Sequence, residues 1–395
     1  MLKEGKKEKI IGIIILAVVI VAVIVIKNIS TTVKTNNKVI DVYGAVGGGK
    51  EDFLADEKVN KILNEKYKIN LVYDNWSNGK TVLAPLVREY VHKGNESVPE
   101  SSWSVNNNSC SKYDILFTSD ERFYNYYKEP PVGGEAERYR VQDGSLTLNT
   151  PIVIYSWDVV VEALEKENVV TKKDGTYYIT DMNKLIDYII NNKKWSDIGL
   201  SQIFGYINIY SVDPVTSSPG ASYYGLLLSI MSEGQISEEN IEQTLPKLKK
   251  FYDKSGYMNN TPADLFESFL KQGVGSKPMI VDYEKSIVEF KNANPAGYDT
   301  IKDKIRILYP TPTIWNSHCI AAFNDNGVKY LKAFDDKEIS QIAWNNYGFR
   351  TGLTGGNYDV KGAGVEGIPS SIESSTPGLK MNIYNRLIEY LRDGE

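Results

Sequence analysis

The stretch VIDVYGAVGGGKEDF, residues 39–53, decides the fold of this chain. Its first five residues are mostly apolar or β-branched, which is typical of a strand. Glycines from Gly44 to Gly49 then form a loop, and a polar helix is expected over 52–66. A second apolar stretch, INLVY at 69–73, predicts another strand. Strand, helix and strand in this order make a βαβ unit, and such a unit implies a parallel sheet.

The same alternation continues along the rest of the chain. Further strands are expected at 113–117, 150–156, 207–210, 278–283 and 305–310. Helices are expected near 160–167, 181–191, 221–232, 238–255 and 264–272. Because strands and helices alternate throughout, the sequence predicts an α/β fold.

An uninterrupted apolar run, IIGIIILAVVIVAVIVI at 10–26, precedes this pattern. As a helix it would span roughly 25 Å, near the lower limit for crossing the hydrocarbon core of a membrane. The lysines between Lys3 and Lys9 mark that end as cytoplasmic. We therefore expect a single-pass protein of the cell membrane with the bulk of the chain outside the cell. Its first parts are a cytoplasmic tail, a transmembrane anchor and a polar stalk, at 1–9, 10–27 and 28–37.

A cleaved signal peptide is the main alternative to a retained anchor. Signal peptides end in a small-residue cleavage site, whereas the residues from Lys27 to Ser30 offer none. A buried N-terminal core helix is the third interpretation, and whether the segment is cleaved stays open.

Charge, cysteine and histidine counts exclude several classes of function. The chain has 45 Lys and Arg against 50 Asp and Glu, a formal net charge of −5, so a nucleic-acid partner is not expected. Cys110 and Cys319 allow either one disulfide or two separate thiols. His92 and His318 lie far apart in the sequence, which makes a zinc site unexpected. We predict no metal and no other cofactor.

Two loops that precede helices are candidate ligand sites. GAVGGGKE at 44–51 nearly matches a phosphate-binding loop, but Glu51 stands where the Mg²⁺-binding hydroxyl residue would be. The alternative is a glycine loop whose backbone N–H groups face a ligand cleft. In SVDPVTSSPG at 211–220, Ser217 or Ser218 can cap the following helix, alone or while also holding a polar or anionic ligand. No spacing selects a pair of catalytic carboxylates, so we do not expect an enzyme.

The order of several stretches resembles the bacterial extracellular solute-binding proteins of the type II periplasmic-binding fold. The resemblance covers about 38–352, and it is strongest to the subset that includes anion-binding members. It rests on VIDVYGAVGGGKEDF, DILFTSD, TPIVIYSWDVVVEAL, DPVTSSPG, DLFESFLKQGVGSKPMIVDYEKSIVEF, IRILYPTPTIW, HCIAAF and WNNYGFRTG.

The resemblance implies two lobes that close on a small polar ligand, with an anion as one possibility and the charge left open. Two strands would cross between them, near 150–156 and 307–313. Lobe 1 would comprise 38–150, lobe 2 would comprise 151–310, and 311–395 would return to lobe 1 and end in a C-terminal helix. The positions that match ligand-binding parts of the family are Gly47, Gly48, Gly49, Lys50, Ser119, Asp120, Ser217, Ser218, Tyr283 and Glu284.

The resemblance also implies roles for these residues. Lys50 would neutralise an anion, the serines would donate hydrogen bonds to it, and Tyr283 would cover it. For a cationic ligand, Asp120 and Glu284 would be the partners instead. The implied function is solute capture by a monomer for the permease of an ABC-type uptake transporter or for another membrane protein. An orphan sensor or surface-complex subunit is the second hypothesis, and an extracellular hydrolase is the third.

Overall fold

The computed structural model describes residues 38–76, 113–129, 141–256, 258–259, 261–352 and 358–394. Asp41–Glu395 forms one unit of the chain and Met1–Ile40 the other. Within the described residues, no helix is both long enough and apolar enough to cross a membrane. The predicted tail, anchor and stalk, together with His92 and Cys110, lie outside the described residues, and Cys319 is a buried free thiol.

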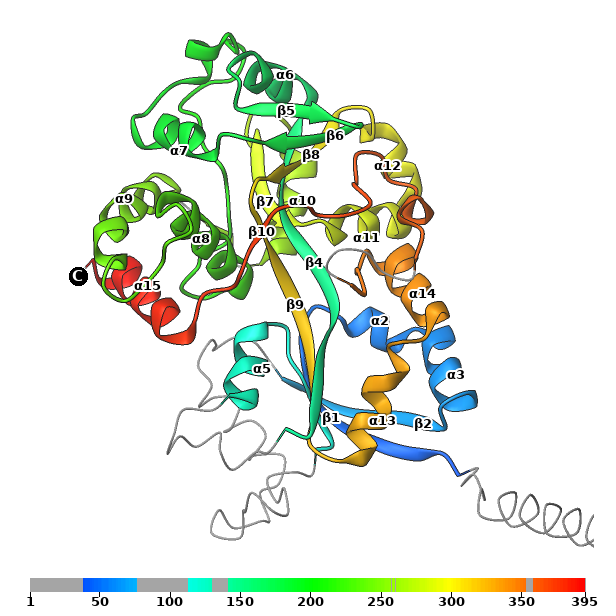
Figure 1. Ribbon diagram of the computed structural model, residues 1–395. Helices are drawn as coiled ribbons and strands as arrows, with labels where there is room; N and C mark the ends of the chain where they lie inside the picture. The colour runs from blue at the N-terminus through cyan, green and yellow to red at the C-terminus, as the bar shows by residue number, and fades with distance from the viewer. Residues whose placement is uncertain are drawn as a thin grey trace, which may run out of the picture. The chain divides into compact units, whose positions relative to one another are not determined.

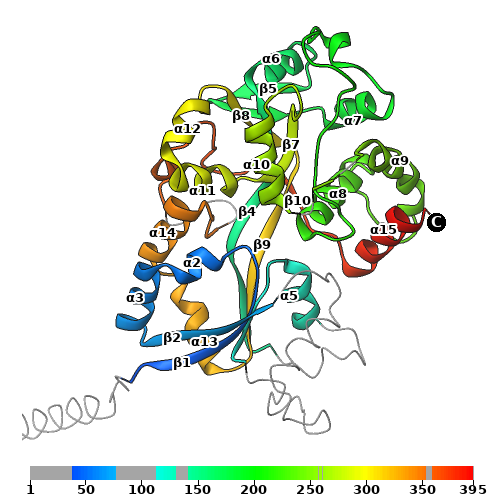
Figure 2. The same ribbon diagram turned by 180° about the vertical axis from the view of Figure 1, so that it is seen from behind.

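One long strand, β4 (Asp143–Trp157), runs through both halves of the sheet. Its N-terminal part pairs antiparallel with β9 (Thr313–Ala322). Its C-terminal part pairs antiparallel with β7 (Met279–Tyr283) and β8 (Ile305–Pro310). The C-terminal part is buried on both faces, so its apolar run needs no alternation with polar residues. Figures 1 and 2 show β4 and β9 passing between the two halves, which we call lobe 1 and lobe 2.

Lobe 1 is built around β1 (Ile40–Gly47), and its strands follow the order β2-β1-β3-β9-β4. Here β2 spans Ile69–Trp76 and β3 spans Ile115–Phe117. β1 and β3 are parallel, but β3 and β4 both pair antiparallel with β9. The sheet is therefore mixed, whereas the sequence pattern predicted a parallel one. The helices of lobe 1 are α2 (Glu51–Ala55), α3 (Glu57–Glu65), α5 (Glu121–Lys128), α13 (Asp325–Ala333) and α14 (Lys337–Tyr347).

Lobe 2 contains β7, β8 and a hairpin formed by β5 (Val170–Lys173) and β6 (Thr176–Ile179). β6 continues the sheet by pairing in parallel with β8. Its helices are α6 (Asp158–Lys166), α7 (Met182–Ile190), α8 (Ser218–Met231), α9 (Ile241–Lys254), α10 (Pro262–Gln272), α11 (Lys285–Ala293) and α12 (Pro295–Ile301), with the short 3₁₀ helix η4 (Trp195–Ile198).

The C-terminal segment, residues 358–394, contacts elements of both lobes. After the 3₁₀ helix η5 (Val360–Ala363), β10 (Ser375–Thr376) pairs with the start of β9. The last helix, α15 (Met381–Asp393), packs against α8 and α9 of lobe 2. This corrects the predicted return of all of 311–395 to lobe 1. The physical reason is that the apolar face of α15 is buried in the core of lobe 2.

Three local predictions also need correction. β1 continues to Gly47, so the loop expected from Gly44 is short and α2 begins at Glu51. The single helix predicted over 52–66 is divided at Asp56, whose carboxylate accepts hydrogen bonds from the first backbone N–H groups of α3. The strand expected at 207–210 forms only an isolated bridge to β7.

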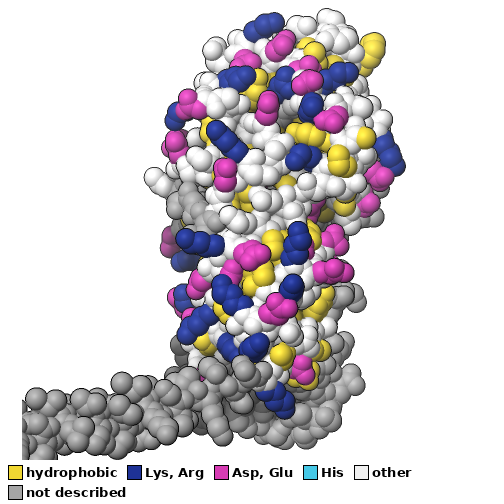
Figure 3. All heavy atoms as spheres, turned by 90° about the vertical axis from the view of Figure 1, so that its right-hand side faces the viewer, with side chains coloured by type: hydrophobic (Ala, Val, Ile, Leu, Met, Phe, Trp, Pro, Cys, Tyr) yellow, Lys and Arg dark blue, Asp and Glu magenta, His cyan; other side chains and the backbone are white. Residues whose placement is uncertain are grey.

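Charged side chains of both signs are mixed on the face that Figure 3 shows. On that face they do not gather into the basic stripe that nucleic-acid binding requires.

Candidate functional site

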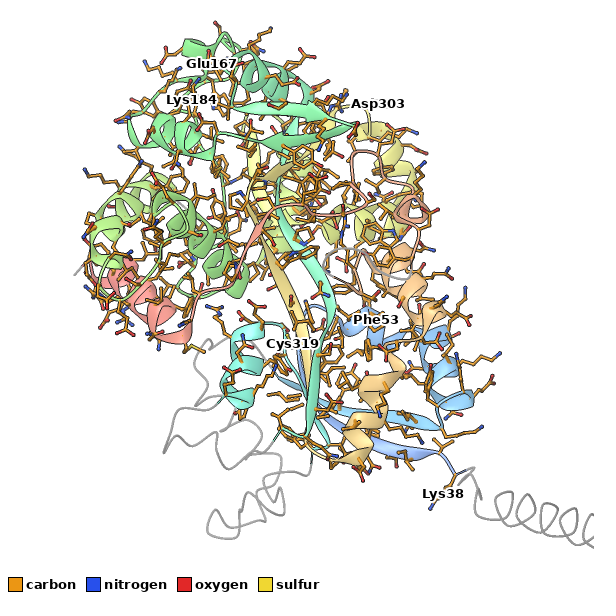
Figure 4. All side chains as sticks on the ribbon, in the orientation of Figure 1. Lys38, Phe53, Glu167, Lys184, Asp303 and Cys319 are labelled. Carbon is orange, nitrogen blue, oxygen red and sulfur yellow. The ribbon has the colours of Figure 1, made fainter. Side chains whose placement is uncertain are left out.

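A pocket with a volume of about 620 Å³ lies between lobe 1 and lobe 2. Lobe 1 contributes the start of α2 and the end of α14, and lobe 2 contributes α10, the end of β7 and α11. Its lining residues lie within 49–53, 261–270, 282–293 and 347–349. Figure 4 labels Phe53 on α2, at the edge of lobe 1 that is next to lobe 2.

A larger hollow of about 720 Å³ lies along α7 on lobe 2. All of its lining comes from 181–197, and every lining side chain is at least partly exposed. Ligand sites are concave and contain a few convergent buried polar groups, so the pocket between the lobes is the better candidate.

Lys50 belongs to the lobe 1 side of the pocket lining and is almost completely buried. Its Nζ donates hydrogen bonds to the carbonyl oxygen of Gly47 and, at 3.2 Å, to Oγ of Ser119. The same Nζ lies 4.7 Å from the centre of the Phe117 ring, a cation–π contact. Desolvation penalises the charged form and lowers the pKa of Lys50 to about 7, although the nearby Glu51 carboxylate opposes this shift.

The glycines before Lys50 bring the loop against Ser119. Oγ of Ser119 donates a hydrogen bond of 2.6 Å to the carbonyl oxygen of Gly48. A Cβ atom at Gly47 would lie 2.5 Å from that same Oγ, so only glycine allows this approach. Gly49 has φ +84°, the left-handed conformation that favours glycine. The predicted residues from Gly47 to Lys50 and Ser119 therefore meet, but their polar groups bond largely to one another.

The two acidic residues that were predicted to bind a cationic ligand form ion pairs with arginines instead. Asp120 is buried, caps α5, and forms a bidentate ion pair with Arg122. Glu284 is fully buried, and both of its carboxylate oxygens bind the guanidinium of Arg350, at 2.7 and 2.8 Å. The hydroxyl of Tyr309 donates a third hydrogen bond to Glu284. Neither carboxylate lines the pocket.

The serine-rich loop lies elsewhere in lobe 2. Ser217 occupies the N-cap position of α8, but its side chain makes no capping hydrogen bond, and Ser218 is the first helical residue. Ser217 does not line the 620 Å³ pocket. A ligand at this helix N-terminus stays a prediction that rests on the sequence.

Tyr283, at the end of β7, lines the pocket as predicted for the ligand site. Its neighbour Asp282 lines the pocket too, although the sequence analysis did not assign it to the site. Oδ1 of Asp282 accepts a hydrogen bond of 2.7 Å from the backbone N–H of Tyr283. Among the described residues, Oδ2 has no hydrogen-bond partner. Burial raises the pKa of Asp282 to about 7, although the Ser286 hydroxyl and Lys285 lie near enough to favour the charged form in part.

A signal for Asp282 was present in the sequence. The strand MIVDY has one acidic residue in an otherwise apolar or aromatic run, and a buried carboxylate needs a partner or a function. The rest of the lobe 2 wall had no such signal, because Lys285, Glu289 and Phe266 lie at ordinary positions of amphipathic helices.

No group of His, Cys, Asp and Glu among the described residues is arranged to hold a metal ion. His318 lies under the pocket, where burial and the two nearby lysines lower its pKa well below the ordinary value. Its imidazole packs against Phe349 at 5.1 Å between ring centres.

No protein-family model and no curated protein matches the sequence. Solved structures do match it. One, from Bordetella parapertussis, is described as an extracellular solute-binding protein and has a TM-score of 0.54 at 13% identity, covering 89% of this chain and 97% of that chain. Another, an ABC transporter protein from Clostridium perfringens, has a TM-score of 0.52 at 13% identity, covering 89% and 98%. The chain therefore has the type II periplasmic-binding-protein-like fold of such proteins, as the sequence predicted.

Proposed function

We propose that this chain is an extracellular solute-binding protein that captures a small polar ligand in the pocket between its lobes. The observation that carries the proposal is the 620 Å³ pocket, because both lobes contribute to its lining and both contribute buried ionisable groups. Phe53 belongs to lobe 1 and Asp282 to lobe 2, so a ligand that contacts both holds the lobes together.

Binding rather than catalysis is the proposed activity. Two of the carboxylates that the sequence offered, Asp120 and Glu284, are held by arginines and lie outside the pocket lining. A screen with sugar and ester substrates tests this part of the proposal, and steady turnover of any of them would contradict it.

Ligand binding is expected to close the lobes by a hinge at the crossing strands. A metabolite library, screened by thermal shift, identifies a ligand first. At a hundredfold excess over Kd, that ligand should stabilise the protein by about 2.7 kcal/mol. Small-angle scattering should then show a smaller radius of gyration in its presence. A clear thermal shift with an unchanged radius would argue against closure.

We further propose that the apolar run at 10–26 tethers the protein to the outer face of the cell membrane, where it serves an ABC-type uptake transporter. A sensor or surface-complex subunit would have the same fold and topology. Protease added to intact cells should digest the bulk of the chain and leave a membrane-bound N-terminal fragment. Recovery of the protein from the medium, cut near residue 30, would instead identify a signal peptide.

A further inference from the structure

The charged residues that line the pocket are mainly acidic. Two lysines, Lys50 and Lys285, belong to the lining. Five carboxylates belong to it as well, namely Glu51, Asp52, Glu267, Asp282 and Glu289. Glu51, Asp52 and Glu267 are exposed, whereas Asp282 is buried and Glu289 half-buried. The excess of carboxylates over lysines makes the lining more attractive to cations than to anions.

Neither lysine offers a free ammonium group to an anion. Lys50 is buried, and its Nζ already donates to Gly47 and Ser119. The Nζ of Lys285 forms an ion pair of 2.6 Å with Glu289. Each lysine is therefore already engaged by partners within the protein, and an anion would share the ammonium charge with them.

One carboxylate oxygen of the pocket, Oδ2 of Asp282, can by contrast accept a hydrogen bond from a ligand. Oδ2 of Asp282 is buried, belongs to a pocket-lining residue, and has no hydrogen-bond partner among the described residues. A buried acceptor without a donor is unfavourable, and a charged donor compensates it better than a neutral one. The Ser286 hydroxyl also lies near the Asp282 carboxyl, but it is neutral. A ligand group with a positive charge and an N–H bond is therefore the partner that would compensate Oδ2 best.

Aromatic side chains from both lobes surround the remaining space. Phe266 and Phe290 of lobe 2 meet edge to face at 6.0 Å. Phe53 and Tyr347 of lobe 1 meet in the same way at 5.7 Å. All four line the pocket. They provide apolar contact area, and aromatic rings also attract organic cations.

We infer that the ligand of this pocket is an organic amine, whose protonated nitrogen donates to Asp282 and whose apolar body lies among the aromatic rings. The inference rests on the proposed function and specifies its ligand class. A quaternary ammonium compound fits less well because it has no N–H to donate. Asp282 thus takes the place of Asp120 and Glu284, which the sequence favoured for a cation.

The test uses the full chain in detergent and a panel of alkyl and phenylalkyl compounds, each prepared as the amine, the alcohol and the carboxylate. Titration calorimetry should give the amine at least about tenfold tighter binding than its alcohol and its carboxylate. Asp282→Asn should weaken amine binding by about tenfold to hundredfold. Asp253→Asn, the same change on α9 away from the pocket, should leave the affinity unchanged.

Folding of the variant is checked by its thermal unfolding without ligand. Asn keeps an oxygen acceptor for the Tyr283 N–H, so Asp282→Asn is expected to fold. Tighter binding of the carboxylates, or amine binding that is unaffected by Asp282→Asn, would overturn the amine assignment and leave solute binding standing. If neither this panel nor a broad metabolite library contains a compound that binds, the inference and the proposed function both fail.

Discussion

Arg350→Ala is expected to lower the free energy of unfolding by about 3–5 kcal/mol, because it leaves Glu284 charged, buried and unpaired. The two side chains are 1% and 0% exposed. Arg350 follows α14, and Glu284 follows β7. The guanidinium also donates to the carbonyl oxygens of Pro369, at 2.7 Å, and Ser370 in the C-terminal segment. One side chain therefore connects three parts of the chain that are distant in sequence.

The chain offers a matched control for this variant. Arg386 on α15 forms an ion pair with Glu242 on α9, with hydrogen bonds of 2.6 and 2.9 Å, but both side chains are partly exposed. Solvent screening makes such pairs weak, so Arg386→Ala should lower stability by at most about 1 kcal/mol. Urea denaturation of both variants measures the difference. Equal losses would show that burial does not determine the strength of the Arg350 pair.

A second variant clarifies the origin of the effect. Replacing both partners, as in Glu284→Leu with Arg350→Met, leaves no buried charge without a counter-ion. The double variant should therefore be more stable than Arg350→Ala. A double variant that is less stable than Arg350→Ala would mean that the loss comes from packing and the carbonyl contacts.

Asp282→Asn is expected to stabilise the protein at alkaline pH by about 3–5 kcal/mol while it weakens ligand binding. Burial raises the pKa of Asp282 from its ordinary value of 3.8 to about 7 in the folded protein. Each pKa unit corresponds to about 1.4 kcal/mol. The stabilising contribution of the protonated folded form is fully present below about pH 4 and is lost as the pH rises through about 7. Asn has no proton to lose.

Urea denaturation between pH 4 and pH 8 checks this prediction. The stability difference between Asp282→Asn and the parent should be near zero at pH 4 and should grow as the pH rises to 8. Lys50 does not affect this difference, because both proteins contain it. Asp253→Asn, an exposed control, should stay within about 0.5 kcal/mol of the parent at each pH. A stability difference that does not change with pH would show that burial does not raise the pKa of Asp282.

The two effects of Asp282→Asn have a common cause. A buried carboxylate oxygen without a partner destabilises the free protein, and the same oxygen is available to a ligand. Binding sites commonly lower stability in this way, so removal of the group should raise stability and lower affinity together.

Residues close in sequence made part of the site predictable. Gly47 ends β1, and Gly48 and Lys50 lie between it and α2, so the sequence places them at a strand end where α/β proteins bind ligands. Asp120 and Arg122 are two positions apart, so their ion pair was also open to sequence reasoning, although it was not predicted. The ion-pair partner of Glu284 could not be predicted from the sequence. Arg350 is 66 positions away, and only tertiary packing brings the two residues together.

By itself, the sequence determined the class of the fold, the order of its strands and helices along the chain, and the expectation of a membrane anchor at 10–27. These properties follow from hydrophobic periodicity and from local residue preferences, which act over short segments. Only the tertiary structure decided which carboxylates are paired, that α15 packs on lobe 2, and that Asp282 lines a pocket with aromatic walls. The physical reason is that ion pairing and burial depend on distances through space between segments remote in sequence.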